Sequence, residues 1–249
     1  MKKWDELPAE MRTEEVRYYY DILCKKKFSL AMKRLFDIVV SAIMLAVLSL
    51  VFVILAVAIK MDSPGPVFYR QERVTTYGKR FRIFKFRTMV CDADQKGSLV
   101  TVKNDSRVTR VGSLIRKCRL DEISQLIDVF LGNMTFVGTR PEVAKYVNRY
   151  EPVMMATLLL PAGVTSEASI LYKDEDKLLD GAENADDVYV EKVLPGKMHY
   201  NLRSIENFSF WGDIGTMIKT VFAVMGKEYA NDLPIKEEQL GEKEVAAKT

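Results

Sequence analysis

The stretch IVVSAIMLAVLSLVFVILAVAI, residues 38–59, decides the fold class, because its 22 residues include no charge, proline or glycine. As an α-helix rising about 1.5 Å per residue it would be roughly 33 Å long, and the hydrocarbon core of a bilayer is about 30 Å thick. A cleaved signal peptide does not fit, since the run begins far from the N-terminus and has no small-residue cleavage site. The sequence therefore predicts a membrane segment.

Positive charges flank this segment on both sides. Lys33 and Arg34 precede it and Lys60 follows it. Because Lys and Arg beside a membrane segment favour the cytoplasmic side, the flanks predict a re-entrant hairpin that returns to the cytoplasm, with Cys24 on that side. The length of the run also allows a crossing.

Charge is divided unevenly along the 249 residues, whose formal net charge is +3. Residues 60–119 hold 15 Lys or Arg against 5 Asp or Glu, whereas residues 120–249 hold 13 against 22. This division is unusual for a nucleic-acid binder and typical of a basic surface that faces an anionic membrane or a phosphorylated ligand. Three unclustered cysteines and a single histidine favour a reducing compartment and argue against a disulfide framework or a zinc site.

Local patterns predict the remaining elements. Residues 67–89 alternate around a glycine-containing turn and predict a β-hairpin, and Ser113 is expected to cap a helix that runs to Leu131. Residues 142–160 and 207–225 predict two further helices, whose apolar parts fit either a membrane interface or a packed core. Residues 11–34 fit either an interfacial lead-in or an ordinary soluble helix.

Two adjacent carboxylates, Asp121 and Glu122, stand out in the segment RKCRLDEISQLIDVF (116–130). In the ordinary interpretation Asp121 pairs with Lys117 on a solvated helix face, which contributes only about 0.2–0.5 kcal/mol. Adjacent helical residues point about 100° apart, so each carboxylate would have a separate role. The surrounding arginines and the membrane segment favour phosphate chemistry, because a pyrophosphate repels a carboxylate nucleophile until a cation neutralises its charge.

Four motifs follow one another along the chain: KRLFDI (33–38), FKFRTM (84–89), RLDEISQLIDVFLGNMTFVGTRPE (119–142) and DVYVEKV…FSFWGDIGTMIKTV (187–221). In this order they resemble the bacterial sugar transferase family of monotopic phosphoglycosyl transferases, over roughly residues 32–222. The central motif is the most specific, since the acidic pair and the FVG-x-RP segment keep the family spacing.

The resemblance implies a helix-rich α/β enzyme, anchored in the membrane by a re-entrant helix, with a short β-hairpin and interfacial amphipathic helices. Such enzymes lie on the cytoplasmic face of the bacterial inner membrane. They use Mg²⁺ to transfer sugar 1-phosphate from a UDP-sugar to undecaprenyl phosphate, releasing UMP, as the first membrane step of glycan biosynthesis. Membrane lipids would be partners and nucleic acids would not. The transferred sugar, the glycan pathway and the oligomeric state are left open.

The same resemblance implies residue roles. Asp121 would attack the β-phosphorus and also contact Mg²⁺, while Glu122 would orient the site or handle a proton. The substrate-binding residues would be Arg116, Arg140, Pro141, Lys85, Arg87, Lys33 and Arg34, the last two placed where lipid phosphates lie.

This sequence departs from the family pattern in three places. Ser49 is followed by Leu50 where the family has a proline that breaks the membrane helix. Thr139 replaces the first proline of the PRP motif. The later segment PAGVTS (161–166) has lost an arginine, although it retains Gly163.

The predicted organisation has four parts: a lead-in (1–32), a re-entrant membrane segment (33–60), a cytoplasmic catalytic domain (61–226) and a charged, disordered tail (227–249). Two other functions fit less well. An idle membrane scaffold would have tolerated the loss of Asp121 or Arg140, and both are present. A membrane-anchored nucleic-acid binder would explain the basic half, but the chain has no recognised nucleic-acid motif.

Overall fold

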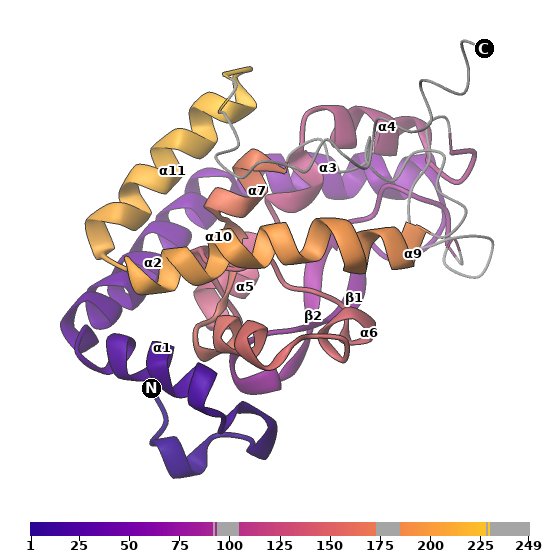
Figure 1. Ribbon diagram of the computed structural model, residues 1–249. Helices are drawn as coiled ribbons and strands as arrows, with labels where there is room; N and C mark the ends of the chain where they lie inside the picture. The colour runs from indigo at the N-terminus through magenta and orange to yellow at the C-terminus, as the bar shows by residue number, and fades with distance from the viewer. Residues whose placement is uncertain (92, 94–104, 173–184, 228, 230–249) are drawn as a thin grey trace.

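The computed structural model describes residues 1–91, 93, 105–172, 185–227 and 229 (Figure 1). The helices are α1 (Glu14–Cys24), α2 (Lys27–Val47), α3 (Ser49–Asp62), α4 (Arg110–Lys117), α5 (Gln125–Leu131), α6 (Ala144–Val147), α7 (Glu167–Leu171), α9 (Ala185–Val188), α10 (Leu194–Glu206) and α11 (Phe210–Val224). The strands are β1 (Phe68–Val74), β2 (Arg80–Phe86), β3 (Met134–Val137) and β4 (Ala162–Thr165). Nearly all of the tail predicted for 227–249 lies outside the described residues.

Shorter turns of helix connect these elements. The 3₁₀ turns are η1 (Trp4–Glu6), η2 (Ala9–Met11), η3 (Thr76–Gly78), η5 (Leu120–Glu122) and η6 (Pro152–Leu159), and η7 (Tyr189–Val193) is a π-helix. The described part of the chain is rich in helix and its sheets are short, as predicted.

The predicted hairpin is confirmed. Strands β1 and β2 pair antiparallel from Phe68 opposite Phe86 to Val74 opposite Arg80. In the turn, Tyr77 and Gly78 both adopt positive φ, 57° and 74°, and such backbone angles suit a tight reversal of the chain. The second sheet is a short parallel pair, β3 with β4, in which Met134 lies opposite Ala162.

Helices α2 and α3 bend by 60° at Leu48, although no proline or glycine is present there. Leu48 leaves helical geometry, with ψ at 2°, and its N–H still bonds to the carbonyl of Met44. The two helices pack against different cores. Leu45 and Leu48 contact the apolar cluster formed with α5 and β3. Leu55 and Ile59 belong to another cluster, with Phe86 and Ile115, so α2 and α3 pack on two different surfaces of the protein. Packing thus explains how the run bends at Leu48 without the expected proline.

The predicted continuous helix from Ser113 to Leu131 is wrong. Its first part, α4, begins earlier, at Arg110, with the Thr109 hydroxyl accepting from the Gly112 N–H. Arg119 then adopts a left-handed conformation, with φ at 56°, which an α-helix cannot include. The acidic pair consequently lies in η5, between α4 and α5, rather than on a regular helix face.

The helix predicted over 142–160 is also wrong, whereas the one over 207–225 is confirmed as α11. The first region divides into α6 and η6, which are separated at Pro152, and a residue before proline is biased away from helical geometry. The Ser209 side chain caps α11 by accepting from the Gly212 N–H. The apolar part of η6 is buried: Met154, Ala156, Leu158 and Leu159 are all core residues.

The N-terminal segment packs into the body of the protein. Side chains from before α2, including Met11, Val16 and Leu23, share one core cluster with Leu159 and Phe208 from after α3. Of the two interpretations of residues 11–34, this packing favours an ordinary packed helix for α1. It also joins the two ends of the α2–α3 pair in a single folded unit.

Candidate functional site

The acidic pair is held against the hairpin. The Ser124 hydroxyl, at the start of α5, lies 3.0 Å from the carbonyl oxygen of Phe84 and 3.3 Å from that of Asp121. Phe84 is in β2 and is followed by Lys85, so this contact fixes η5 beside the Lys85 side chain. The left-handed backbone of Arg119 changes the direction of the chain before η5. As a result, the side chains of Asp121 and Glu122 lie in different environments.

Glu122 is paired with two cations. Its Oε1 atom lies 3.3 Å from the Nζ of Lys85, and the Arg140 guanidinium forks onto both carboxylate oxygens. Burial opposes ionisation of Glu122, but the charges of Arg140 and Lys85 together outweigh it and hold the pKa of this carboxyl well below its usual range. Glu122 is therefore a fixed anion that orients two cations, and it is a poor proton donor.

Asp121 has a different environment. Its Oδ1 atom is buried and has no hydrogen-bond partner among the described residues. Burial raises the pKa of this carboxyl, and the Glu122 charge adds to the rise, while Lys85 and Arg116 oppose it. A buried carboxylate oxygen without a partner costs free energy, so an atom in this position calls for a functional or solvent partner. Its setting among cations suits an anionic substrate that must approach a carboxylate.

The ordinary interpretation of the pair is not supported. Within the described residues, Lys117 is exposed and forms no ion pair with Asp121. Arg116, one residue earlier on α4, is half-buried and close enough to lower the pKa of Asp121. The structure therefore brings together five of the predicted site residues: Asp121, Glu122, Lys85, Arg116 and Arg140.

Arg73 joins this cluster and was missed in the sequence. In the hairpin register Tyr69 lies opposite Lys85 and Arg73 lies opposite Phe81, so these side chains share one face of the sheet. Arg73 donates to the Gln71 side chain and to the carbonyl of Pro141. Burial lowers the pKa of Arg73, and the charge of Arg140 adds to this effect. The period of two in β1 could have revealed it, once Lys85 was placed in the site.

The Arg140 turn depends on a close approach of two glycines. A Cβ on Gly163 would lie 2.2 Å from the backbone nitrogen of Gly138, which is much too close for any side chain. This approach lets the Gly163 N–H donate to the Thr139 carbonyl at 2.8 Å, directly before Arg140. The retained glycine of PAGVTS therefore supports the site through the backbone, although the arginine of that segment is lost.

Three predicted substrate-binding residues, Lys33, Arg34 and Arg87, form hydrogen bonds with other parts of the protein. Lys33 is buried and its Nζ lies 2.7 Å from the Val137 carbonyl and 2.5 Å from Asp213. Arg34 donates to the carbonyls of the last turn of α5, at Val129 and Phe130.

Arg87 is only 5% exposed, and its guanidinium donates to the Pro64 and Ser63 carbonyls at the end of α3. The structure does not bring these three cations to the acidic pair. Pro141 is buried within the Arg140 turn, and its carbonyl accepts a hydrogen bond from the Arg73 guanidinium.

The donor set at the acidic pair fits one divalent cation of the magnesium type. The described residues contain no cluster of three or more His, Cys, Asp or Glu side chains that could hold a metal alone. Mg²⁺, however, is commonly held by one or two carboxylates together with substrate phosphates and water. The orphaned Oδ1 of Asp121 is a hard oxygen donor of this kind, whereas Glu122 is already occupied by Lys85 and Arg140.

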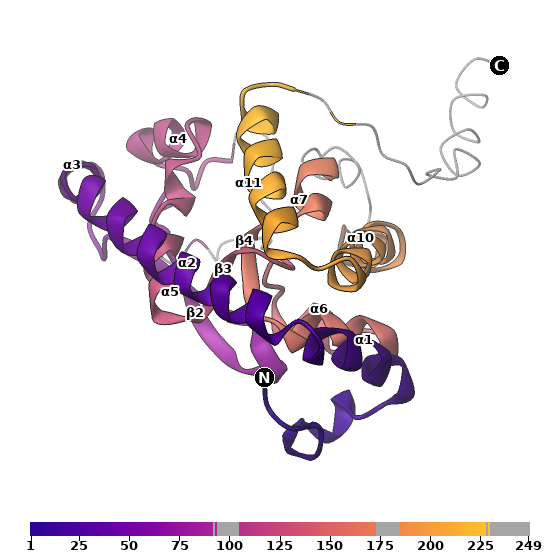
Figure 2. The ribbon, with the colours of Figure 1, turned by 90° about the vertical axis from the view of Figure 1, so that its left-hand side faces the viewer.

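Apolar side chains cover the outer faces of α2, α3 and α11. Helices α2 and α11 contact each other, lie at the left of Figure 1 and both face the viewer in Figure 2. The exposed apolar residues on these faces include Leu35, Ile43, Val47, Leu50, Val53, Ile54, Val57, Trp211, Val221 and Val224. So many exposed apolar side chains on adjoining helices are uncommon on a soluble monomer and are typical of a surface that contacts a membrane or a partner.

The lengths and apolar content of the helices show which of them could cross a bilayer. Among the described helices, none is by itself long and apolar enough to cross a bilayer. Helices α2 and α3 meet both requirements only when they are taken together, across their 60° bend.

Comparisons with known proteins agree with the motifs. The family model described as "Bacterial sugar transferase" matches residues 28–227. A UDP-N-acetylgalactosamine-undecaprenyl-phosphate N-acetylgalactosaminephosphotransferase of Aeromonas hydrophila is 34% identical over 196 residues, which are 78% of this chain and 43% of the relative.

Two UDP-glucose:undecaprenyl-phosphate glucose-1-phosphate transferases are also similar. The protein of Escherichia coli (strain K12) is 33% identical over 195 residues, 77% of this chain and 39% of its own length. The protein of Caulobacter vibrioides is 30% identical over 201 residues, 80% of this chain and 71% of its own length. The chain thus spans about two fifths of the Aeromonas and Escherichia relatives.

Proposed function

The chain belongs to the bacterial sugar transferase family, and we propose that it transfers a sugar 1-phosphate from a UDP-sugar to undecaprenyl phosphate, releasing UMP. The observation that carries the proposal is the asymmetry of the acidic pair. Asp121 has a carboxylate oxygen without a hydrogen-bond partner among the described residues, while Glu122 next to it is fixed by Lys85 and Arg140. One carboxylate is thus available for reaction and the other holds the cations that a diphosphate requires.

The transfer proceeds in two displacements. In the first, a carboxylate oxygen of Asp121 attacks the β-phosphorus of the UDP-sugar, the bond from that phosphorus to the bridging oxygen breaks, and UMP leaves with the bonding electrons. In the second, an oxygen of undecaprenyl phosphate attacks the phosphorus of the sugar-phosphoryl-aspartate, and the Asp121 carboxylate is released. Lys85, Arg140 and Arg116 lie where they would balance the negative charge of both phosphates.

Mg²⁺ is the proposed cofactor, and the Asp121 carboxylate would hold it through one oxygen and leave the other for the attack. When bound, it supplies charge neutralisation at the diphosphate and the departing UMP. We expect chelation with excess EDTA to abolish UMP release and added Mg²⁺ to restore it, because a carboxylate and a diphosphate repel each other strongly without a cation. Full turnover in EDTA would contradict the role of the metal.

The test of the function is turnover by the full chain in nanodiscs that contain undecaprenyl phosphate. UDP-glucose and UDP-N-acetylgalactosamine come first, since relatives are named for these sugars. We expect one of a panel of UDP-sugars to yield UMP together with a lipid-linked diphosphosugar. Hydrolysis of UDP-sugars without a lipid product, or no reaction with any of them, would contradict the proposal.

Arg140 is expected to act on the nucleotide sugar. Arg140→Ala removes the guanidinium fork and should raise KM for the UDP-sugar by about tenfold to a hundredfold, since charged hydrogen bonds of this kind contribute roughly 1.5–3 kcal/mol. Arg140→Lys should recover only part of the loss, because an ammonium does not reproduce the fork. Steady-state kinetics measure both. Arg17→Ala, on α1, where Arg17 pairs with Asp21, is the control; kinetics of Arg140→Ala like those of this control would remove Arg140 from the site.

The proposed location is the cytoplasmic face of the inner membrane, with α2 and α3 entering the bilayer and returning. Two observations support it. The outer faces of these helices are apolar, and the residues before and after them share one core cluster, which a crossing helix pair would pull apart.

Cysteine labelling tests this topology. Cys24 is a poor reporter, because it packs against the N-terminal core. Glu10→Cys, in a chain whose Cys24 is replaced by Ser, places a thiol on exposed η2, and native Cys118 is exposed just before the acidic pair. With a membrane-impermeant maleimide, we expect both positions to be shielded in spheroplasts and labelled after lysis. Opposite labelling of the two positions would show that the chain crosses the membrane.

A further inference from the structure

The turn that carries Arg140 is fixed through its backbone at three points. Its carbonyls accept hydrogen bonds from two different elements: Thr139 from the Gly163 N–H of β4, Pro141 from the Arg73 side chain of β1, and Glu142 from the Val74 N–H, also of β1. The distances are 2.8, 3.1 and 2.9 Å in that order. Both small sheets therefore hold the segment from which Arg140 reaches Glu122.

The Glu142 side chain makes a fourth attachment, to a different part of the molecule. Its carboxylate is buried and accepts from the hydroxyl of Tyr189 at 2.5 Å. The Nζ of Lys197 lies 3.7 Å from the same carboxylate oxygen and 3.0 Å from the Tyr189 hydroxyl. Glu142, Tyr189 and Lys197 are exposed by only 7%, 7% and 5%, so all three polar groups are removed from water.

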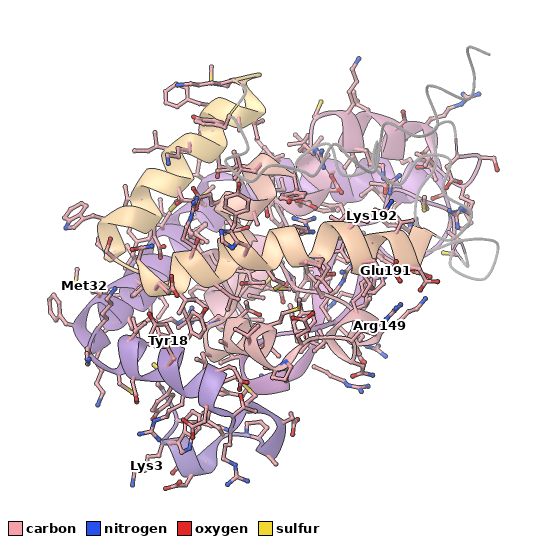
Figure 3. All side chains as sticks on the ribbon, viewed as in Figure 1. Lys3, Tyr18, Met32, Arg149, Glu191 and Lys192 are labelled. Carbon is pink, nitrogen blue, oxygen red and sulfur yellow. The ribbon has the colours of Figure 1, made fainter. Side chains whose placement is uncertain are left out.

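The element that supplies Tyr189 is itself anchored beside the turn. Tyr189 opens the π-helix η7, a rare conformation that is frequent at functional sites. Immediately before it, Asp186 pairs with Lys145 and accepts from the Tyr146 hydroxyl, and Asp187 pairs with Arg149. Figure 3 shows Arg149, Glu191 and Lys192 at the same end of the molecule, where α9 leads through η7 into α10.

A buried carboxylate, phenol and ammonium are costly to retain for packing alone. Taking charged groups out of water is repaid only when their hydrogen bonds are well formed, and apolar side chains of similar volume often serve stability equally well. The three groups also lie close to Arg140, which is proposed to bind the nucleotide sugar. Glu142 is two residues from Arg140, and its charge acts on Arg73, whose guanidinium bonds to the intervening Pro141.

We propose that Glu142 is a positioning residue, which aims Arg140 at the diphosphate of the nucleotide sugar by tying the 139–142 turn to η7 and α10 through Tyr189 and Lys197. The proposal rests on the proposed function for its kinetic consequences and on the four attachments for its structural ones. Glu142 does not touch the reacting atoms. It acts through Arg140, and this dependence distinguishes positioning from a general contribution to stability.

The first experiment measures the turn itself and needs no activity. Hydrogen exchange of the full chain in nanodiscs, followed by mass spectrometry, compares the parent with Glu142→Gln, Tyr189→Phe and the control Glu191→Gln. Glu191 is exposed and belongs to the same π-helix. We expect faster exchange in peptides that contain residues 139–143 for both test variants and parent-like exchange for the control. Unchanged exchange in both test variants would overturn the proposal.

The second experiment measures whether Glu142 acts through Arg140. We expect Glu142→Gln to raise KM for the UDP-sugar by about tenfold with a smaller change in kcat. In an Arg140→Ala chain the same substitution should have almost no further effect on KM. Glu142→Asp should keep part of the function, because the charge remains while its reach is shorter.

A rise in KM that is as large in the Arg140→Ala chain as in the parent would overturn the positioning role. If no UDP-sugar is turned over by the parent, the proposed function fails, and the exchange experiment still decides whether Glu142 holds the turn. The two failures are therefore distinguishable.

Discussion

Asp121→Asn is expected to abolish UMP release, with a loss of at least about a thousandfold in turnover. Asparagine has nearly the same shape as aspartate but is a very weak nucleophile, so the first displacement has no attacking group. The substitution should leave the fold intact, because the buried Oδ1 of Asp121 has no hydrogen-bond partner among the described residues. The measurement is UMP release by the chain in nanodiscs, with melting temperature as the check on folding.

Asp21→Asn is a suitable control for this variant. It makes the same chemical change at an exposed position of α1, where Asp21 pairs with Arg17 one turn away. Parent-like turnover in Asp21→Asn and none in Asp121→Asn is the expected result. If Asp121→Asn retained more than a few per cent of the parent rate, a different group would be the nucleophile.

Glu122→Gln is expected to have the second-largest effect, on both stability and turnover. Removing its charge leaves Lys85 and Arg140 facing each other without their shared anion, and breaking such a half-buried ion pair costs about 1–3 kcal/mol, between the values for exposed and fully buried pairs. Misplacing the two cations should also slow turnover by about a hundredfold. Thermal unfolding and steady-state kinetics measure the two effects.

A second substitution separates these effects. In Lys85→Met/Glu122→Gln the uncompensated charges are reduced, so part of the lost stability should return, whereas turnover should stay low. A parent-like rate in Glu122→Gln would remove Glu122 from the site.

The pH dependence of stability follows from the low pKa of Glu122. Because its folded-state pKa lies below the ordinary value of 4.5, its contribution to stability is complete above that value. The contribution is lost as the pH falls through the lower folded-state pKa.

The sequence predicted those parts of the structure that depend on local patterns. Alternation and a glycine turn predicted the hairpin, and the largely apolar stretch 207–225 predicted α11. The basic surroundings of Asp121 and Glu122 were also predicted, and the structure places Lys85, Arg116 and Arg140 around them. These signals arise within short stretches, where the choice of residue reflects the local backbone directly.

The features that could not be predicted depend on contacts between distant residues. Nothing in the sequence predicts the left-handed conformation of Arg119, since glycine and asparagine are the residues that most often adopt a positive φ. The flanking charges predicted a hairpin, but the position of its bend, at Leu48, was not predictable without the expected proline, because it depends on α2 and α3 packing on two different clusters. Lys33 was expected near lipid phosphate, yet its partner Asp213 is 180 positions away. Such pairings appear only once the chain is folded.

The central claim is that Asp121 carries the sugar phosphate between the two displacements. Its most direct test is to incubate the parent chain with a labelled UDP-sugar, without undecaprenyl phosphate, and to quench it in acid. Cleavage after Arg119 yields a peptide that begins at Leu120, so tandem mass spectrometry can assign the adduct. We expect about one equivalent of UMP, a phosphosugar mass on Asp121, and transfer of the label when undecaprenyl phosphate is added. UMP release that requires the lipid, with no label on the protein, would contradict it.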